Sequence, residues 1–195
     1  MDDRLADRLL ALAAGDLETR ERLAADGRLF DGYHPEMQAV HEANAAALEA
    51  IVAEVGWPTA ERVGEAAAEA AWLVAQHAIG LPDFQRACLE GLKGAVAAGK
   101  APAWQMAKMI DRILTFEGRP QVYGTSFDWD ESGRLSPRPI EDPGAVDRRR
   151  AEVGLEPLEA ATARIRLRDA AEPRPADLAE RRRRMDEWAR RVGWR

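Results

Sequence analysis

One stretch of the chain, residues 111–127, gathers polar side chains that could bind or transform a substrate. It reads DRILTFEGRPQVYGTSF and follows a long run of helical, alanine-rich sequence. Its candidate site residues are Asp111, Arg112, Gln121, Tyr123 and Thr125. If the second half of the stretch is extended, the last three of these side chains point to the same side. An amide, a phenol and a hydroxyl would then form a polar lining for a ligand.

His77 is the candidate general base, because an imidazole is the side chain that exchanges protons near neutral pH. It lies near the end of a helix predicted over residues 60–78. Asp111 is predicted on a neighbouring helix, where its carboxylate would fix the tautomer of His77 and raise its basicity. Two structural alternatives stay open. His77 could be a half-buried ring bonded to a backbone carbonyl, and Asp111 could pair with Arg112 to hold the following loop.

Metal and cofactor motifs are missing from the sequence, so no metal site and no cofactor are expected. His34 and His41 are seven residues apart, about 10 Å along a helix, which is too far for one ion. Convergence of His41 with the distant His77 is open, although the spacing does not require it. The chain has no phosphate-binding glycine loop and no nucleophile elbow. Its one cysteine, Cys88, fits a buried position on an amphipathic helix.

The composition predicts an all-α fold. Of the 195 residues 46% are hydrophobic, mostly alanine, and strand-forming residues are sparse. We expect a compact antiparallel helical bundle, an irregular proline-rich segment at 118–142 that could form a short hairpin, and a C-terminal helical extension. The predicted helices cover residues 2–14, 17–29, 35–55, 60–78, 83–99, a stretch from 102, 143–153, 157–170 and 176–192.

Several boundaries depend on single residues. Gly15 is expected to end the first helix and Asp16 to cap the second. Residues 172–175 are typical of a linker. Residues 1–158 are predicted to form the helical bundle domain, and residues 159–195 its polar, arginine-rich extension.

The net charge of the chain limits the classes of molecule that it is expected to bind. The net charge of −6 makes nucleic acid an unexpected partner. The arginine runs 148–150 and 181–184 are interpreted as solvated helix faces paired with carboxylates. The alternative is that the arginine-rich C-terminal helix binds an acidic protein. No signal pattern and no apolar run of about 20 residues is present, so we expect a cytoplasmic protein that does not enter a membrane.

The order of several short motifs resembles an uncharacterised bacterial family of domains of unknown function. The motifs are Gly56-Trp57-Pro58, Val63-Gly64, Gln76-His77, Asp111-Arg112 and Gln121 to Thr125, within residues 35–158. The family pattern continues with glutamine after Tyr-Gly-Thr, where this chain has Ser126. The resemblance implies no established activity, but it supports His77, Asp111, Gln121, Tyr123 and Thr125 as site residues.

Two functions remain open at this point. The first is an acid–base or hydrolytic enzyme acting on a small molecule or peptide, with His77 as base, Asp111 as its partner, and Arg112 with the polar row as substrate contacts. The second is a non-catalytic binding or protein-interaction module, in which the polar row only holds its own loop. Exposure of the His77 ring would favour the first function.

Overall fold

The computed structural model describes residues 2–30, 32–168 and 177–195. The chain is all-α, as predicted, with one two-stranded sheet. Its contacts group into two compact units, Met1–Ala101 and Pro102–Arg195. The domain boundary predicted after residue 158 stays a prediction, and the linker predicted at 172–175 lies outside the described residues.

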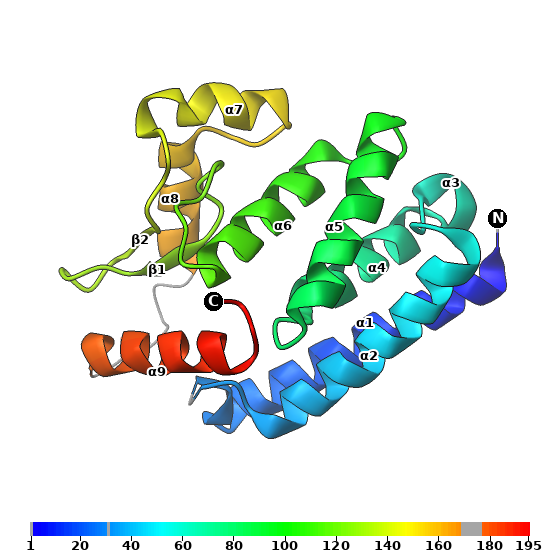
Figure 1. The fold of residues 1–195 in the computed structure, drawn as a ribbon, viewed down its shortest axis with the longest axis horizontal. Helices are drawn as coiled ribbons and strands as arrows, with labels where there is room; N and C mark the ends of the chain where they lie inside the picture. Colours follow the sequence, from blue (N-terminus) through cyan, green and yellow to red (C-terminus); the bar gives the residue numbers. More distant parts are fainter. Residues whose placement is uncertain (1, 31, 169–176) are drawn as a thin grey trace. The chain divides into compact units, whose positions relative to one another are not determined.

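The first unit is a bundle built around two long helices. Its elements are α1 (Asp3–Ala25), η1 (Arg28–Phe30), α2 (Pro35–Val55), α3 (Ala60–Val63), α4 (Glu65–His77) and α5 (Pro82–Ala97). Helices α1 and α2 lie side by side and antiparallel, and α4 packs against both (Figure 1). Three helices therefore meet along one seam, and polar side chains on that seam are held close together.

Helix α1 is continuous, so the predicted break at Gly15 and the capping role of Asp16 are wrong. A glycine inside a helix costs only about 1 kcal/mol, and the packing of α1 against α2 and α4 outweighs that cost. Asp16 lies in the middle of the helix with 0% of its surface exposed. Its carboxylate therefore serves a tertiary contact and not a helix end.

The other helix boundaries in this unit follow local signals. Helix α2 begins at Pro35 and ends before Gly56, whose φ of 76° suits only glycine, as predicted. The helix predicted over 60–78 is instead two helices, because Gly64 adopts a φ of 82° between α3 and α4. The prediction of one helix missed this turn since the alanine-rich pattern continues across it.

The core of the first unit combines a few large side chains with many alanines. The large ones are wholly or almost wholly buried, and they include Leu9, Leu23, Leu48, Ile51 and Val74. On α4, four alanines are buried beside them, which allows the helix axes to approach closely. Cys88 is 3% exposed, as predicted, and burial raises the pKa of its thiol to about 12. It is therefore a packing residue and not a nucleophile at neutral pH.

The second unit carries the irregular segment and the C-terminal helices. Its elements are α6 (Ala103–Phe116), β1 (Phe127–Trp129), β2 (Leu135–Pro137), η2 (Pro143–Ala145), α7 (Val146–Glu152), α8 (Leu158–Arg168) and α9 (Leu178–Arg191). The predicted hairpin is confirmed: β1 and β2 pair antiparallel, with Phe127 opposite Pro137. Residues 121–125 precede this hairpin and follow α6, which fixes their place in the unit.

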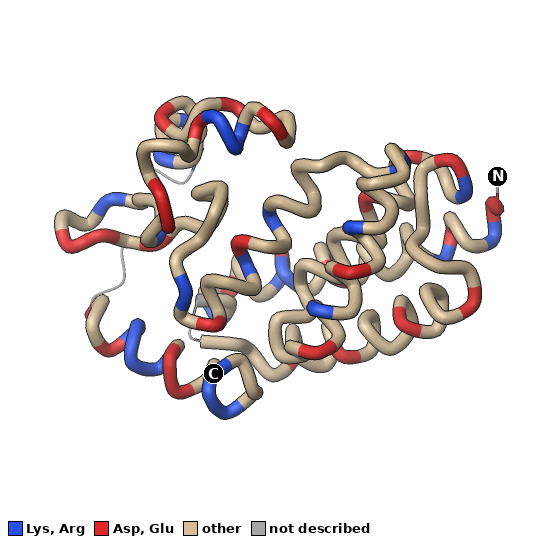
Figure 2. Tube along the Cα trace, turned by 45° about the horizontal axis from the view of Figure 1, so that its top comes forward, with Lys and Arg blue, Asp and Glu red and all other residues tan. Residues whose placement is uncertain are grey.

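Helix α9 docks within this unit through aromatic side chains. Trp188 and Trp194 are 8% and 3% exposed, and both rings contact Phe116 at the end of α6. Basic and acidic residues follow one another along α9 (Figure 2). Over the described ranges, the chain has no helix that is both long and apolar enough to cross a bilayer.

Candidate functional site

Three titratable side chains from three helices meet in the first unit. They are Asp16 on α1, His41 on α2 and His77, the last residue of α4. The Nδ1 atom of His77 lies 2.8 Å from Oδ1 of Asp16, and Nε2 of His41 lies 3.3 Å from Oδ2. One buried carboxylate thus stands between two imidazoles. We refer to these three residues as the Asp–His–His cluster.

Neighbouring polar contacts fix the helices that carry the cluster. The Asn44 amide, one turn after His41, donates to the Leu12 carbonyl on α1 at 3.0 Å. The buried Gln85 amide on α5 donates to the carbonyls of Ala75 and Gln76 at 2.7 and 2.9 Å. These carbonyls belong to the last turn of α4, where helix oxygens lack partners of their own. Gln85 therefore holds the helix end that presents His77.

Tyr33 supports the cluster from the segment before α2. Its hydroxyl lies 2.8 Å from Nδ1 of His41. Gly80 makes room for the phenol, because a Cβ at that position would lie 3.2 Å from the Tyr33 ring. Burial raises the pKa of Tyr33, and the charges of Glu42 and Asp16 raise it further, so the hydroxyl stays protonated.

The charge of Asp16 depends on its two histidine neighbours. Burial alone would raise the pKa of its carboxyl, but the imidazoles of His41 and His77 hold that pKa well below its usual range. Within the part of the chain that the structure describes, Oδ2 of Asp16 and Nε2 of His41 are buried without a hydrogen-bond partner. Their 3.3 Å approach is an ion-pair distance that lacks hydrogen-bond geometry. The Asp16 carboxylate is therefore ionised, and the hydrogen bonds of the cluster are incomplete among the described residues.

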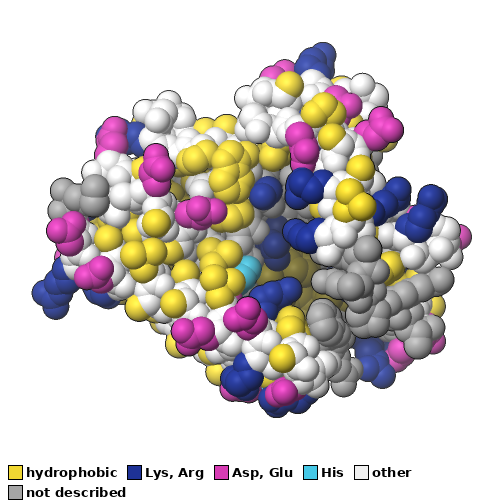
Figure 3. All heavy atoms as spheres, turned by 180° about the vertical axis from the view of Figure 1, so that it is seen from behind, with side chains coloured by type: hydrophobic (Ala, Val, Ile, Leu, Met, Phe, Trp, Pro, Cys, Tyr) yellow, Lys and Arg dark blue, Asp and Glu magenta, His cyan; other side chains and the backbone are white. Residues whose placement is uncertain are grey.

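The cluster is partly open to solvent through one member only. The side chain of His77 is 23% exposed, whereas that of His41 is 10% and that of Asp16 is 0% exposed. Figure 3 shows one face of the molecule, with hydrophobic, charged and histidine side chains at the surface. The three potential ligand atoms lie within 4.8 Å of one another, so the cluster could hold a metal ion. It could also transfer a proton between His77 and a bound molecule.

The carboxylate of Asp111 binds the backbone of its own loop. Oδ1 accepts the amide N–H groups of Val122 at 2.7 Å and Tyr123 at 3.0 Å. Oδ2 accepts the amide of Thr125 at 2.8 Å and its hydroxyl at 2.9 Å. With 0% of its surface exposed, Asp111 is a hub for residues 121–126, which we call the Asp111 loop. The carboxylate bonded to His77 is Asp16. Asp111 holds its loop through the bonds above, a role that the sequence alternative gave to a pair of Asp111 with Arg112.

Arg150 binds the opposite, carbonyl side of the Asp111 loop. Its Nη1 donates to the carbonyl oxygens of Tyr123 at 2.7 Å and Gly124 at 3.4 Å, and its Nε donates to that of Glu156 at 2.6 Å. Arg149 donates to the carbonyl of Val122 at 2.9 Å. Arg150 is only 3% exposed. The interpretation of this arginine run as a solvated face is therefore wrong for Arg150, because its guanidinium is buried and donates hydrogen bonds to carbonyl oxygens of the chain.

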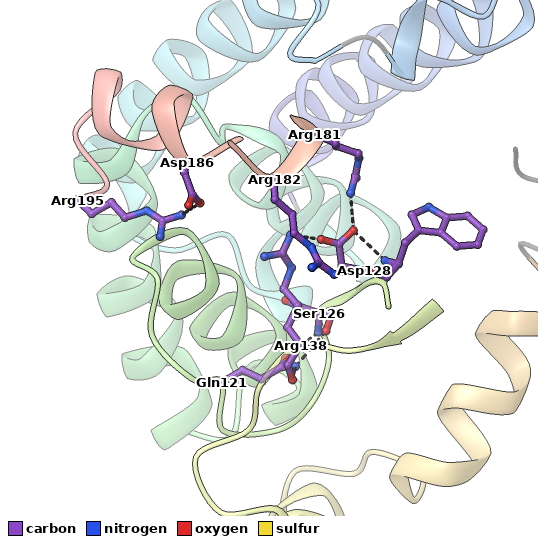
Figure 4. Close-up of polar contacts among 9 residues, drawn as sticks. Gln121, Ser126, Asp128, Arg138, Arg181, Arg182, Asp186 and Arg195 are labelled. Atoms are coloured by element: carbon purple, nitrogen blue, oxygen red, sulfur yellow. Dashed lines mark hydrogen bonds and ion pairs between the residues drawn. The ribbon is translucent and has the colours of Figure 1, made fainter. Parts of the chain in front are cut away.

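Gln121 is a structural member of the same loop. Its amide nitrogen donates to the carbonyls of Ser126 at 3.0 Å and Arg138 at 2.8 Å, and its amide oxygen accepts the Ser126 N–H at 2.8 Å (Figure 4). It is 0% exposed. Because both ends of the amide are bonded to backbone, Gln121 has little capacity left for a ligand. The contacts with residue 126 use its backbone and do not depend on the serine side chain.

The remaining predicted contacts are half-buried. The Thr125 hydroxyl donates a hydrogen bond to Asp111. The side chain of Tyr123 is half-buried, and burial and the charge of Asp111 raise the pKa of its phenol. Arg112 is half-buried on α6 next to Asp111. Substrate contact by Arg112 and Tyr123 stays a prediction.

A second charged cluster joins α9 to the hairpin. Asp128 binds Arg138 at 2.8 Å and also pairs with Arg181, while Arg182 donates to the Trp129 carbonyl at 2.8 Å (Figure 4). In the first turn of α9, Glu180 bridges Arg183 and Arg184. Arg181, Arg183 and Arg184 thus pair with carboxylates, as predicted, whereas Arg182 donates to a backbone carbonyl.

A family model matches residues 3–172, which is most of the chain and includes both the Asp–His–His cluster and the Asp111 loop. The chain belongs to the family of unknown function DUF6624. No curated protein and no solved structure matches it. Helix α9 begins after the matched DUF6624 region ends.

Sequence reasoning missed two key residues of this DUF6624 chain. Asp16 was assigned to a helix cap, although its spacing of seven from Leu9 and Leu23 places it on the buried stripe of one long helix. Tyr33 gave no signal, because it lies in an irregular segment whose path is set by tertiary packing. His77 was predicted as a site residue, and the structure brings it together with Asp16 and His41.

Proposed function

We propose that this chain is an enzyme that performs acid–base or hydrolytic chemistry on a small molecule or peptide, with the Asp–His–His cluster as its reactive centre. The single observation that carries the proposal is a buried, ionised carboxylate bonded to an imidazole that is itself partly exposed. Buried charges are costly, and proteins place such strained titratable groups at functional sites.

The geometry suits His77 as the group that meets the substrate. A carboxylate bonded to Nδ1 orients the ring and stabilises the imidazolium that forms when the ring takes a proton. The 2.8 Å contact from Asp16 supplies this support. The side chain of His77 is 23% exposed, which supports a base that a substrate can reach over a histidine sealed in the core. Asp16 thereby takes the role that the sequence assigned to Asp111.

The alternative is a non-catalytic binding or protein-interaction module. The Asp111 loop favours this alternative, because the polar groups of Gln121 and Thr125 already form hydrogen bonds within the chain and are not turned toward a substrate. An acidic partner for the arginine-rich C-terminal helix has less support, since Arg181 and Arg183 already pair with carboxylates of this chain. The single cysteine, which excludes an internal disulfide, fits the predicted cytoplasmic location.

The test measures ligand effects and stability in the same variants. Wild type, His77→Gln and the control His34→Gln are screened against fractions of a metabolite and peptide mixture, by the shift of the melting temperature and by histidine NMR resonances. His34 is a suitable control because it caps α2 and lies outside the cluster. We expect one fraction to act on wild type and His34→Gln but not on His77→Gln, whose melting temperature changes little.

Two outcomes would contradict the enzyme. If His77→Gln loses much of its stability while every ligand effect persists, His77 is a structural residue. If no fraction affects wild type, and acidic proteins bind to it instead, the interaction module is the better function.

A further inference from the structure

The donor atoms of the Asp–His–His cluster are spaced like the ligands of one metal ion. Ligands bonded to zinc at about 2.0–2.1 Å lie about 3–3.4 Å from one another in tetrahedral geometry. The observed separations are 2.8 Å from Oδ1 of Asp16 to Nδ1 of His77 and 3.3 Å from Oδ2 of Asp16 to Nε2 of His41, so each imidazole approaches a different oxygen of the carboxylate. All three ligand atoms lie within 4.8 Å of one another. Small side-chain movements would therefore bring the three atoms around one ion.

A second observation points to a missing cation. Oδ2 of Asp16 and Nε2 of His41 are buried and face each other, and the described residues offer neither of them a hydrogen bond. Leaving such buried polar atoms unpaired destabilises the fold. An ion bonded to both atoms would remove that destabilisation. We propose that the cluster binds one divalent transition-metal ion of the zinc class through Asp16, His41 and His77.

Tyr33 completes the site in the way that outer partners of metal-binding histidines do. Such a histidine donates its other ring N–H to an oxygen, which fixes the tautomer and the ring orientation. His41 would bind the ion through Nε2 and donate from Nδ1 to the Tyr33 hydroxyl, 2.8 Å away. With this tautomer, Nε2 and Oδ2 both present lone pairs to the space between them, and a cation bound there would stabilise that arrangement.

The donor set also indicates the type of ion and its use. Two imidazoles and one carboxylate suit zinc and its neighbours better than magnesium or calcium, which prefer oxygen ligands. Three protein ligands leave a fourth position for water, as in catalytic zinc sites. Such an ion would lower the pKa of a bound water toward neutrality and so supply a nucleophile for hydrolysis of a carbonyl or phosphoryl compound. This inference rests on the proposed function and selects its hydrolytic form, in which His77 would bind the ion and a water activated by the ion would take the place of the free imidazole base.

The experiment measures metal binding without any substrate. Untagged full-length protein, freed of metal by a chelator, is titrated with Zn²⁺ by calorimetry and with Co²⁺ by visible absorption. The variants are Asp16→Asn, His41→Gln and His77→Gln, with His34→Gln and Asp111→Asn as matched controls. We expect one equivalent of either ion to bind wild type and both controls, with an absorption band typical of nitrogen and oxygen ligation. Binding should fall by at least 100-fold in each cluster variant.

A further variant keeps the proposal testable if the cluster variants fail to fold, which circular dichroism would reveal. Tyr33→Phe removes only the outer partner of His41 and should weaken binding about 10–100-fold. The proposal is overturned if folded wild type binds neither ion, or if binding is unchanged in the folded cluster variants or in Tyr33→Phe. Failure of metal binding with retained ligand effects would leave a metal-free acid–base enzyme. Metal binding without any ligand effect would instead mark a structural metal site.

Discussion

Among the described residues, two aspartates are wholly buried, and they have opposite surroundings. Asp111 accepts hydrogen bonds on both oxygens from the backbone and one hydroxyl of a single loop. Asp16 faces two titratable side chains from other helices, and one of its oxygens lacks a hydrogen-bond donor among the described residues. Both side chains have the same chemistry and the same burial.

The difference shows how to separate a structural acid from a reactive one. Backbone donors are fixed in place and cannot change their charge, so a carboxylate that they saturate can only hold structure. Imidazole donors can gain and lose protons near neutral pH, and a carboxylate bonded to them responds to a ligand or an ion. The hydrogen bonds from backbone N–H groups to the carboxylate, and not the degree of burial, therefore distinguish Asp111 from Asp16.

The largest effect is expected for Asp111→Asn. The new amide would turn its NH₂ group toward backbone N–H donors, and the loss of a charged acceptor should lower the free energy of unfolding by about 3 kcal/mol. Amide hydrogen exchange at Val122, Tyr123 and Thr125 should accelerate. The measurements are urea unfolding and residue-resolved exchange, with the exposed Asp83→Asn as control. If the free energy of unfolding fell no further in Asp111→Asn than in the control, the role of Asp111 in holding the loop would be contradicted.

A smaller loss is expected for Arg150→Lys. Lysine keeps the charge but not the planar fork that bonds the carbonyls of Tyr123 and Glu156 together. The expected loss is about 2 kcal/mol, with faster exchange in the Asp111 loop. Arg148→Lys is the matched control on the same helix, since the Arg148 side chain is 76% exposed. Equal stability of the two variants would contradict a structural role for Arg150.

Asp16→Asn should cost only about 1 kcal/mol in the absence of metal. Asparagine removes the buried negative charge and keeps a polar group beside the two imidazoles, so the substitution leaves no unpaired carboxylate in the interior. The variant should nevertheless lose metal binding and ligand effects, whereas Asp111→Asn should lose stability and keep them. Chemical unfolding of the chelator-treated protein gives the stability. The comparison would fail if Asp16→Asn were as unstable as Asp111→Asn.

The smallest effect is expected for Ser126→Gln. Gln121 contacts only the backbone of residue 126, so the free energy of unfolding should change by less than about 0.5 kcal/mol. The matched variant Ser126→Pro removes the N–H that Gln121 accepts and should cost about 1–3 kcal/mol. Both values come from the same urea unfolding experiment. A large effect of Ser126→Gln would mean that its side chain matters to the loop.

Local signals in the sequence were sufficient for much of the secondary structure. Pro35 and Gly56 set the ends of α2, because a fixed φ favours a helix start and a left-handed glycine ends one. The turn residues around Gly133 predicted the hairpin between β1 and β2. The same kind of reasoning failed at Gly15, where packing along the whole of α1 outweighs the weak preference of one glycine.

The site was predictable only in part. His77 was found because its residue type and its place at a helix end suggest chemistry. Its partner was not found, because Asp16 is 61 residues away along the chain and is brought to His77 by the packing of α1 against α4. Asp111 was singled out, but its role depended on which donors the loop would turn toward it.

By itself, the sequence determined the helical class, most helix ends, the hairpin and the choice of His77, because these depend on residue type and on spacing over a few positions. Only the tertiary structure decided which carboxylate serves which partner, that Arg150 is buried, and that His41 and His77 converge. These features arise where segments far apart in the sequence pack together. Burial then gives each polar group a cost that its nearest neighbours must offset, and no local pattern specifies those neighbours.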